Sequence, residues 1–548
     1  MNHDPLQFQG YRALQDVKAL ALKFPNRVTW SESRQKAAEH LKGRFKELGY
    51  EPKGMLFSEI IGGKKISGLE NIYAEKIGKK HPDQIIAVVA HYDAPEGSTE
   101  AAMDDASGVG VVLELARIFS KVETDRSMLF LLTDSEEYGA FWGAHTFVRE
   151  YEKRNQIIAA LNFDFVNLFE MEGILNLNDG LKEGYTPLWL REMALESIRS
   201  LKQVEARDFR NIMEHIQRAI LIPPSDHGEF LAQGIPSFNW LGQNKDFAKL
   251  MREYHHTEKD KLEFLQPRSL DIYGKAAERL MRSINQMTSL PSDFRESNYW
   301  KIGTNLYIPG VAVFILHILA MIPFLTVAML RIVEVFSRTD RKVVKNVILN
   351  ELKNCAVLVG AMGFGYVILM LLPYLRIIDQ YELYPATQKS YLLYHPNYIA
   401  IIGVFTAIGG ALYILGKVFS TKHDALGHPE ARQAVHGVLL AIVIFLAFCK
   451  NSYLATLMLM PPAYLWLAIR VRKQIQGRII NGLLIFSGAI TLVAMSLVMS
   501  QVFHLGVFYW YVFLGAAYGL FSVYTIILVI IIIAIMFRLA RGFVLRKT

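Results

Sequence analysis

The second half of the chain holds long segments without a charged residue, and these constrain its fold more than any other feature. Five such runs lie between Asn305 and Ile469, and a sixth, Ile479–Phe537, spans 59 residues. A helix needs about 20 apolar residues to cross the hydrocarbon core of a bilayer. The last run is long enough for two crossings. We therefore expect an all-α polytopic transmembrane domain of about seven helices in residues 296–548.

Charge is divided unequally between the two halves of the chain. Residues 1–300 hold 38 Lys and Arg against 44 Asp and Glu, whereas residues 301–548 hold 21 against 7. The formal net charge of +8 does not indicate nucleic-acid binding, because the basic excess lies in short loops between apolar runs. Alternate loops carry 17 and 3 basic residues, which predicts a cytoplasmic C-terminus.

With seven helices, this orientation places residues 1–295 outside the cytoplasm. The first 20 residues show no signal-peptide pattern. We therefore expect an export signal or a further transmembrane helix upstream of the sequence. An even number of helices, with residues 1–295 in the cytoplasm, is the alternative. The two cysteines, Cys355 and Cys449, both lie in apolar runs and do not indicate a compartment.

Residues 1–295 alternate between strand-like and helix-like segments. Apolar, β-rich runs lie near residues 69–75, 84–90, 126–133, 157–165 and 235–241. The amphipathic segment Ser31–Leu48 precedes the first run, and further helix-like segments lie between later runs at residues 107–119, 139–151 and 187–201. Strands that alternate with helices are typical of an α/β domain. We expect a mostly parallel central sheet flanked by helices.

Several of the apolar runs end in histidine or carboxylate side chains. Because the carboxyl ends of parallel strands meet at one edge of a sheet, these side chains should converge. They are His91 and Asp93 after IIAVVA, Asp104 and Asp105 before a helix, Glu136 and Glu137 after RSMLFLLTD, and Asp164 in ALNFDF.

Taken singly, each of these features has an ordinary explanation. An H-x-D triplet is usually incidental, acidic residues before a helix are usually caps, and an acidic pair is usually at the surface. Asp164 differs, because an unpaired carboxylate in an apolar strand is costly and requires a metal or a basic partner. The segment YHHTEKD, with His255 and His256, would supply the nitrogen ligand that the other motifs lack.

The ordered combination H-x-D, D-D-x-S-G, E-E, D and H-T-x-x-D resembles the zinc-dependent aminopeptidase family. This family includes bacterial leucyl aminopeptidases, glutamate carboxypeptidases and glutaminyl cyclases. The resemblance covers residues 10–290, and SDHGEF at Ser225–Phe230 is similar to the substrate-side loop of the family. The chain departs from the family's E-E-x-G-L-x-G motif, since one more residue precedes the second glycine.

The resemblance implies the following roles. His91 and Asp164 would hold one zinc ion, Glu137 and His256 a second, and Asp104 would bridge them. Glu136 would be the general base, Asp93 would orient His91, and substrate contacts would come from Asp226, His227 and Tyr254. His255 stays an alternative to His256, which we favour because it directly precedes T-x-x-D. A cis peptide bond between Asp104 and Asp105 is also implied.

A peptidase domain followed by several helices resembles vacuolar membrane proteases and endoplasmic reticulum metallopeptidases. We therefore expect a membrane-anchored, two-zinc aminopeptidase that acts on peptides. A glutaminyl cyclase with one zinc and a non-catalytic membrane scaffold are the alternatives. For the helices themselves, anchoring to the bilayer, homo-oligomerisation and presentation of peptides near the membrane are favoured over transport, because Asp, Glu, Lys and Arg inside the spans are the usual sign of a transport path and the apolar runs contain none.

Overall fold

The computed structural model describes residues 5–61, 64–137, 141–221, 225–304, 306–372, 375, 377, 397–419, 428–456, 524–528, 530–532 and 535. They fall into two compact units. Described residues of 5–210 and 221–299 form the first unit, and those of 211–220 and from 300 onward form the second. Residues 211–220 therefore pack with the second unit although their neighbours on both sides of the chain belong to the first.

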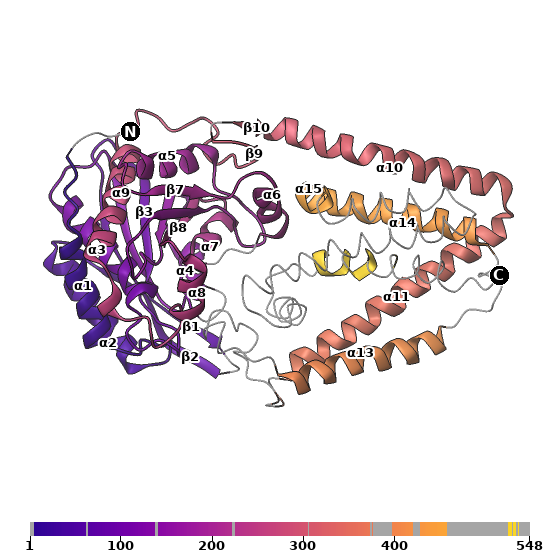
Figure 1. Cartoon of the computed structure of the whole chain (residues 1–548), viewed down its shortest axis with the longest axis horizontal. Coiled ribbons are helices and arrows are strands. Elements are labelled where there is room, and N and C mark those ends of the chain that lie inside the picture. Colours follow the sequence, from indigo (N-terminus) through magenta and orange to yellow (C-terminus); the bar gives the residue numbers. More distant parts are fainter. Residues whose placement is uncertain are drawn as a thin grey trace. The chain divides into compact units, whose positions relative to one another are not determined.

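An eight-stranded mixed sheet forms the centre of the first unit (Figure 1). Its order is β1-β2-β4-β3-β5-β8-β6-β7, and the four neighbours β4, β3, β5 and β8 run parallel. The strands are β1 (Lys53–Ile61), β2 (Lys64–Lys76), β3 (His81–His91), β4 (Arg126–Thr133), β5 (Ile157–Phe163), β6 (Gly173–Leu177), β7 (Glu205–Asp208) and β8 (Ser237–Gln243). The expected α/β domain with a mostly parallel centre is confirmed.

Helices cover both faces of this sheet. They are α1 (Gly10–Lys23), α2 (Glu32–Glu47), α3 (Ser107–Ser120), α4 (Trp142–Glu150), α5 (Leu188–Arg199), α7 (His227–Ala232), α8 (Phe247–Glu253) and α9 (Pro267–Asn285). Successive residues of a strand point to opposite faces. On β3, Ile86 and Val88 thus pack into the core with α1, α3 and α9, whereas Ala87 and Val89 pack into the core with α4 and α7.

Local sequence signals account for both ends of α2. Ser31 caps α2, since its hydroxyl accepts a hydrogen bond from Arg34 N at 3.1 Å. Gly49, with φ of 89°, ends the same helix in the left-handed region, which favours glycine.

The strands β1, β6 and β7 fall outside the strand predictions. The first is half exposed at the sheet edge and the other two span five residues or fewer, so their hydrophobic patterns are weak.

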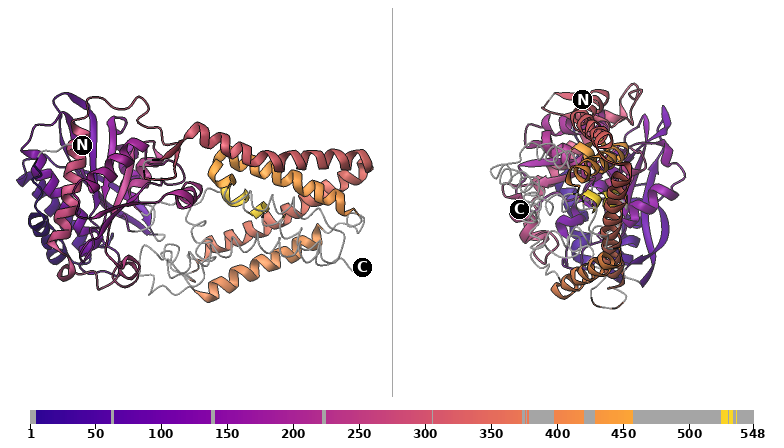
Figure 2. Two further views of the ribbon diagram at one scale, coloured as in Figure 1. Left: turned by 45° about the horizontal axis from the view of Figure 1, so that its top comes forward. Right: turned by 90° about the vertical axis from the view of Figure 1, so that its right-hand side faces the viewer.

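The second unit contains the helices α6 (Asn211–Ile220), α10 (Gly310–Arg338), α11 (Arg341–Leu371), α13 (Tyr398–Val418), α14 (Pro429–Lys450) and the short α15 (Ser452–Leu454). It also contains the short strands β9 (Tyr299–Lys301) and β10 (Tyr307–Pro309), except that the first residue of β9, Tyr299, belongs to the first unit. Pairs of long helices lie side by side, α10 with α14 and α11 with α13 (Figure 2). In the described part of the chain, four helices are long and apolar enough to cross a bilayer: Gly310–Arg338, Arg341–Leu371, Tyr398–Val418 and Glu430–Lys450.

The basic segment Arg331–Lys353, expected to be a loop, is helical except around Thr339 and Asp340, because α10 and α11 extend beyond their apolar runs. The helices expected in Asn451–Ile469, Ile479–Gln501 and the run to Phe537 lie largely outside the described residues. The count of seven therefore stays a prediction.

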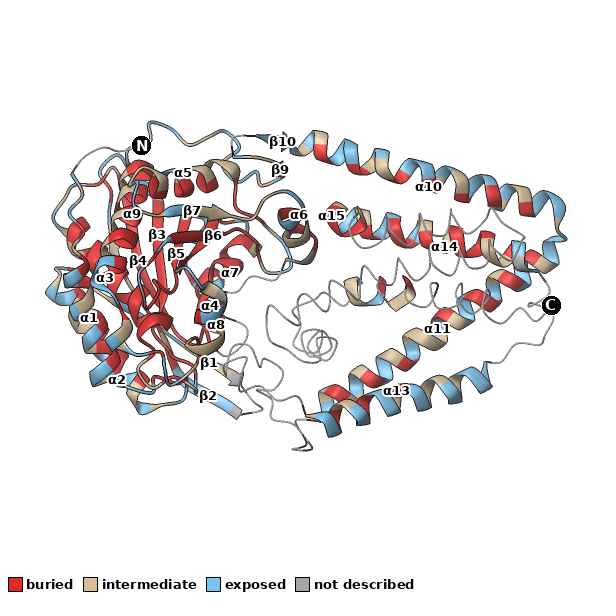
Figure 3. Cartoon of the chain, viewed as in Figure 1, coloured by how far each residue is buried: buried red, intermediate tan, exposed pale blue. Residues whose placement is uncertain are grey.

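The long helices carry many exposed residues (Figure 3), and large apolar residues are among them. Val311 on α10 is 75% exposed, and Ile399 on α13 is 80% exposed. Water disfavours such extended apolar surfaces, whereas lipid accommodates them. The outward residues support association of this unit with a membrane.

One buried charged contact joins two of the candidate spans. Glu351 Oε2 of α11 lies 2.8 Å from His436 Nε2 of α14. The contact is a hydrogen bond, and it is an ion pair when the histidine is protonated. Glu351 precedes the charge-free run expected in this region, and the helix includes it because the helix begins ten residues earlier, at Arg341. An acidic side chain thus lies within a candidate spanning helix, which the charge-free runs alone did not reveal.

The central position of β5 leads to a stability prediction. Leu161 is fully buried between β3 and β8, so Leu161→Ala should lower the free energy of unfolding by about 2–5 kcal/mol through loss of packing and a residual cavity. Thermal unfolding of the detergent-solubilised chain measures this. Leu56→Ala, at a side chain that is 69% exposed on β1, is the matched control and should have little effect. Equal melting temperatures for the two variants would contradict the assigned core.

Candidate metal centre

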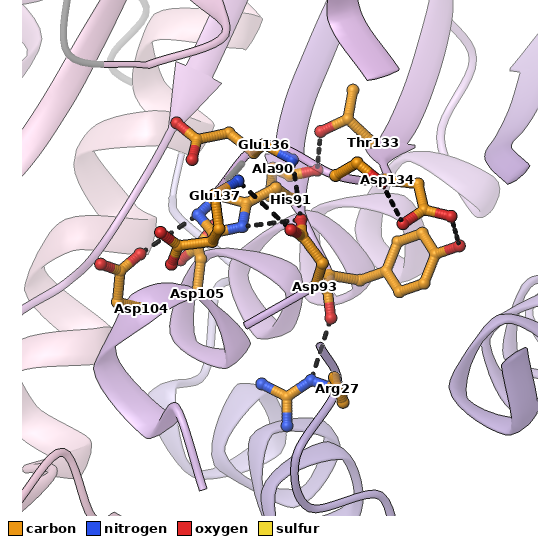
Figure 4. A network of polar contacts seen from close by, with 12 residues as sticks. Arg27, Ala90, His91, Asp93, Asp104, Asp105, Thr133, Asp134, Glu136 and Glu137 are labelled. Carbon is orange, nitrogen blue, oxygen red and sulfur yellow. Dashed lines mark hydrogen bonds and ion pairs between the residues drawn. The ribbon is translucent and has the colours of Figure 1, made fainter. Parts of the chain in front are cut away.

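The end of β3 positions His91 and Asp93 on one side of the chain. Asp93 Oδ1 lies 3.3 Å from His91 Nδ1, whereas the Tyr92 hydroxyl between them donates to Asp134 at 3.0 Å in the opposite direction. Asp93 also accepts hydrogen bonds from Glu136 N at 3.0 Å and Glu137 N at 3.2 Å (Figure 4). One buried carboxylate therefore holds the imidazole at the end of β3 in register with the acidic pair after β4.

Asp104 lies between two histidines that are far apart in the sequence. Its Oδ1 is 3.1 Å from His91 Nε2, and its Oδ2 is 3.1 Å from His256 Nε2. All three side chains are buried. The two oxygens of a single carboxylate thus face two separate imidazole nitrogens, which is the arrangement a bridging ligand requires.

A further carboxylate accompanies each histidine. Asp164 Oδ1 lies 3.8 Å from His91 Nε2, and Glu137 Oε2 lies 3.1 Å from His256 Nε2. Asn239 on β8 donates to the second oxygen of Asp164 at 3.1 Å and fixes its orientation. The described residues therefore contain two His–carboxylate sets that share Asp104.

The turn before α3 that carries Asp104 is held from two sides. Asp260 accepts hydrogen bonds from Met103 N at 2.7 Å and Asp104 N at 3.1 Å. Asp105 accepts a hydrogen bond from Gly108 N at 2.7 Å, as a helix cap does. A Cβ at Gly108 would lie 2.1 Å from the carbonyl oxygen of Phe163, so only glycine permits this close approach of α3 to β5. The peptide bond between Asp104 and Asp105 is cis, as the resemblance implies.

His255 competes with His256 for the same carboxylate. Its Nε2 lies 2.9 Å from Asp104 Oδ2, and the two imidazole rings stack with centroids 3.7 Å apart. His256 reaches Glu137 as well as Asp104, so it joins the second set more completely. Asp104, His255 and His256 together form one group whose ligand atoms could hold an ion; His91, Asp105 and Asp164 form another, and His91, Glu136 and Glu137 a third.

Burial and mutual repulsion shift the protonation of the carboxylates. Burial raises the pKa of Glu136 and of Glu137 well above the usual range, and Glu137 is raised further by the charge of Asp104. Burial also favours neutral Asp104, but hydrogen bonds from His255, His256 and His91 outweigh it and hold the pKa of Asp104 well below the usual range. In the absence of cations the centre therefore favours the neutral forms of Glu136 and Glu137, and a bound cation would favour their charged forms.

The donor set fits zinc ions. Glu137 Oε1 and Asp105 Oδ2 are buried and make no hydrogen bond among the described residues. Buried carboxylate oxygens without donors, beside imidazole nitrogens, are the ligands that Zn²⁺ binds in proteins. These orphaned oxygens and the convergent histidines indicate a metal centre.

The predicted substrate contacts lie in different surroundings. Asp226 and His227 are completely buried, and the Thr133 hydroxyl donates to Asp226. Burial raises the pKa of Asp226 to about 7 and lowers that of His227 to about 3. Tyr254 is half-buried, with its ring 5.0 Å from that of Phe169. The role of these three residues in substrate binding stays a prediction.

Some residues of the centre had no assigned role in the sequence. Asn239 donates a hydrogen bond to Asp164, and Asp260 accepts one from the backbone of Asp104, so both contact predicted ligands. Arg27, below the centre in Figure 4, belongs to no motif. The D of H-T-x-x-D marks Asp260, but a lone Arg in a loop and an Asn in an apolar strand carry no local signal.

Part of the chain is similar to known peptidases. Residues 71–281 match the family model of peptidase family M28. Aminopeptidase YwaD of Bacillus subtilis is 29% identical over 201 residues, covering 36% of this chain and 40% of that protein. A probable zinc metalloprotease of Pyrenophora tritici-repentis is 34% identical over 106 residues, covering 18% and 24%. The chain thus spans less than half the length of these curated relatives.

A solved structure with a similar fold is that of a zinc aminopeptidase from Bacillus subtilis. The superposition has a TM-score of 0.43 at 15% sequence identity and covers 52% of this chain and 96% of that one.

Asp93 provides a test of the centre. Asp93→Asn should weaken zinc binding about 10–100-fold, because the partner that orients His91 and both Glu136 and Glu137 loses its charge. Competition with a chromophoric chelator measures the dissociation constant. Asp125→Asn, at a partly exposed carboxylate just before β4, is the control and should bind zinc as the wild type does. Unchanged affinity in Asp93→Asn would contradict the role assigned to Asp93.

Proposed function

We propose that this chain, whose residues 71–281 carry a peptidase family M28 domain, is a membrane-anchored enzyme that removes N-terminal residues from peptides at a two-zinc centre. The observation that carries the proposal is the position of Asp104, with one oxygen toward His91 and the other toward His256. A single-metal site would not need a carboxylate between two imidazoles.

In this proposal, His91 and Asp164 would hold one zinc ion, Glu137 and His256 would hold the other, and Asp104 would serve as a ligand to both. Bound zinc would supply Lewis acidity, which polarises the peptide carbonyl and favours ionisation of water. Asp93 keeps the imidazole of His91 oriented, and Asn239 does the same for the carboxylate of Asp164.

Glu136 is the proposed general base. Its side chain is 5% exposed, and Asp93 fixes its backbone beside the ligand Glu137. Burial raises the pKa of Glu136, which brings this carboxylate nearer the pH at which it must accept and release a proton. It would take the proton of the attacking water and deliver it to the amine of the leaving peptide.

The excess of carboxylates also bears on where a peptide is cut. Six buried acidic side chains surround the centre: Asp93, Asp104, Asp105, Glu136, Glu137 and Asp164. A free α-ammonium group of a peptide would find a complementary charge here, whereas a blocked N-terminus would not. This favours an aminopeptidase over an endopeptidase.

The helical unit is the proposed membrane anchor. Four described helices are apolar enough to cross a bilayer, and they carry outward-facing apolar side chains. The distribution of basic residues supports an extracytoplasmic peptidase domain, periplasmic or lumenal, and a cytoplasmic C-terminus.

Loss of the general base provides the first test. Glu136→Gln should lower turnover about 10²–10⁴-fold while zinc content stays at the wild-type value, because Gln cannot accept the proton but Glu136 is not a proposed ligand. Metal analysis and peptide hydrolysis are measured on the same preparation. Glu150→Gln, at an exposed end of α4, is the control. Wild-type turnover in Glu136→Gln would reject this role.

Zinc removal and substrate choice provide the second test. The chain should bind two zinc ions per molecule, lose hydrolysis of free aminoacyl reporters on chelation, and regain it when zinc is restored. N-blocked peptides should not be cut. One zinc per chain with cyclisation of N-terminal glutamine would favour the glutaminyl cyclase alternative, and cleavage of blocked peptides alone would reject exopeptidase action.

A further inference from the structure

A completely buried arginine lies beneath the metal centre, where backbone groups surround it. Arg27 is 0% exposed, and in the described part of the chain its guanidinium donates only to backbone carbonyl oxygens and pairs with no carboxylate at hydrogen-bond distance. Buried arginines commonly pair with carboxylates. Here the side chain instead joins backbone segments through hydrogen bonds to their carbonyl groups.

The carbonyl groups around Arg27 come from three parts of the chain. Nε donates to Tyr92 O at 2.9 Å, in the segment that follows β3. Nη1 donates to Glu100 O at 3.0 Å and Nη2 to Ala101 O at 3.1 Å, in the segment that precedes Asp104. Nη1 also approaches the carbonyl oxygens of Leu20 at 3.2 Å and Phe24 at 3.3 Å, at the end of α1.

The backbone around Arg27 reinforces the same link. Ala94 N donates to Arg27 O at 3.1 Å, and Asn26 N donates to Thr99 O at 2.8 Å. The loop between His91 and Asp104 is thus held at both ends by one short segment after α1.

We propose that Arg27 is a positioning residue of the metal centre, which sets the separation between the His91 and Asp104 sides through its fork of hydrogen bonds. Tyr92 lies between His91 and Asp93, and Ala101 lies three residues before Asp104. A planar group with five donors bridges these segments with little freedom of movement. The inference rests on the proposed function, since it concerns residues proposed to hold zinc.

The charge of Arg27 suits this position. Asp260, Asp93, Asp105 and Asp104 all act on it electrostatically. Burial lowers the pKa of Arg27 to about 10, so the side chain is still protonated at neutral pH. The buried cation therefore opposes the repulsion among these aspartates while its hydrogen bonds fix the backbone.

A second buried arginine offers a matched control. Arg126 is 1% exposed and donates to Ile284 O at 3.0 Å and Asn285 O at 2.7 Å. It begins β4, whereas the acidic pair Glu136 and Glu137 follows the end of that strand. Loss of Arg126 removes the same kind of contact from the opposite end of the sheet.

The experiment compares Arg27→Gln, Arg27→Lys and Arg126→Gln in the full chain in detergent. Zinc affinity is measured by chelator competition, the ligand environment by the cobalt(II) absorption spectrum, and the loop by hydrogen exchange of peptides covering residues 92–105 after chelation. Arg27→Gln should weaken zinc binding about 10–100-fold and alter the cobalt spectrum. Arg27→Lys should weaken it less, because one ammonium keeps the charge but cannot span three segments.

Several results would overturn the inference. They are wild-type zinc affinity in Arg27→Lys, equal weakening by Arg126→Gln, and unchanged exchange of residues 92–105 in the chelated Arg27 variants. If Arg27→Gln does not fold, Arg27→Lys decides by the same measurements. The hydrogen-exchange measurement needs no metal, so it tests whether Arg27 holds residues 92–105 even if the wild type binds no zinc. A wild type that binds no zinc would reject the proposed function and not the role of Arg27 in holding this loop.

Discussion

Burial of six carboxylates in one small volume is the constraint on which the first unit depends. Charged carboxylates that lie close together repel one another strongly in a medium of low dielectric constant. Burial by itself also disfavours the charged form of each carboxylate. The raised pKa values of Glu136, Glu137 and Asp105 express this directly. Cationic partners would relieve this repulsion, and the imidazoles of His91 and His256 converge on the shared carboxylate of Asp104.

The neighbouring parts of the fold compensate for this repulsion by holding the backbone. Asp93 and Asp260 accept hydrogen bonds from backbone N–H groups of the two segments that carry Glu137 and Asp104, and Arg27 donates to backbone carbonyl groups of neighbouring segments. Acceptor side chains thus bind the backbone N–H groups near His91 and Asp104, and a donor side chain binds the backbone carbonyl groups. Rigid positioning of this kind limits the reorganisation needed when a metal ion or a substrate binds.

Sequence patterns predicted much of this arrangement, for identifiable reasons. His91, Glu137 and Asp164 each follow or end an apolar run, and parallel strands bring such ends together. The same reasoning is weaker in the helical unit. A charge-free run indicates where apolar surface lies but not where a helix begins. The run that predicted α11 begins at Asn354, whereas the helix begins at Arg341 and therefore includes Glu351. Arg27 had no signal at all, because hydrogen bonds to carbonyl groups place no demand on the residues that supply them.

The sequence by itself determined which chemistry is available: imidazoles and carboxylates at strand ends, and apolar segments of bilayer length. These properties depend on side-chain type and spacing, which can be read along the chain. The tertiary structure decided which oxygen of Asp104 faces which histidine, that His256 rather than His255 reaches Glu137 together with Asp104 in the contacts described, and that Arg27 lies beneath them. Those outcomes depend on contacts between residues more than 60 positions apart in most cases, and only packing of the whole unit determines them.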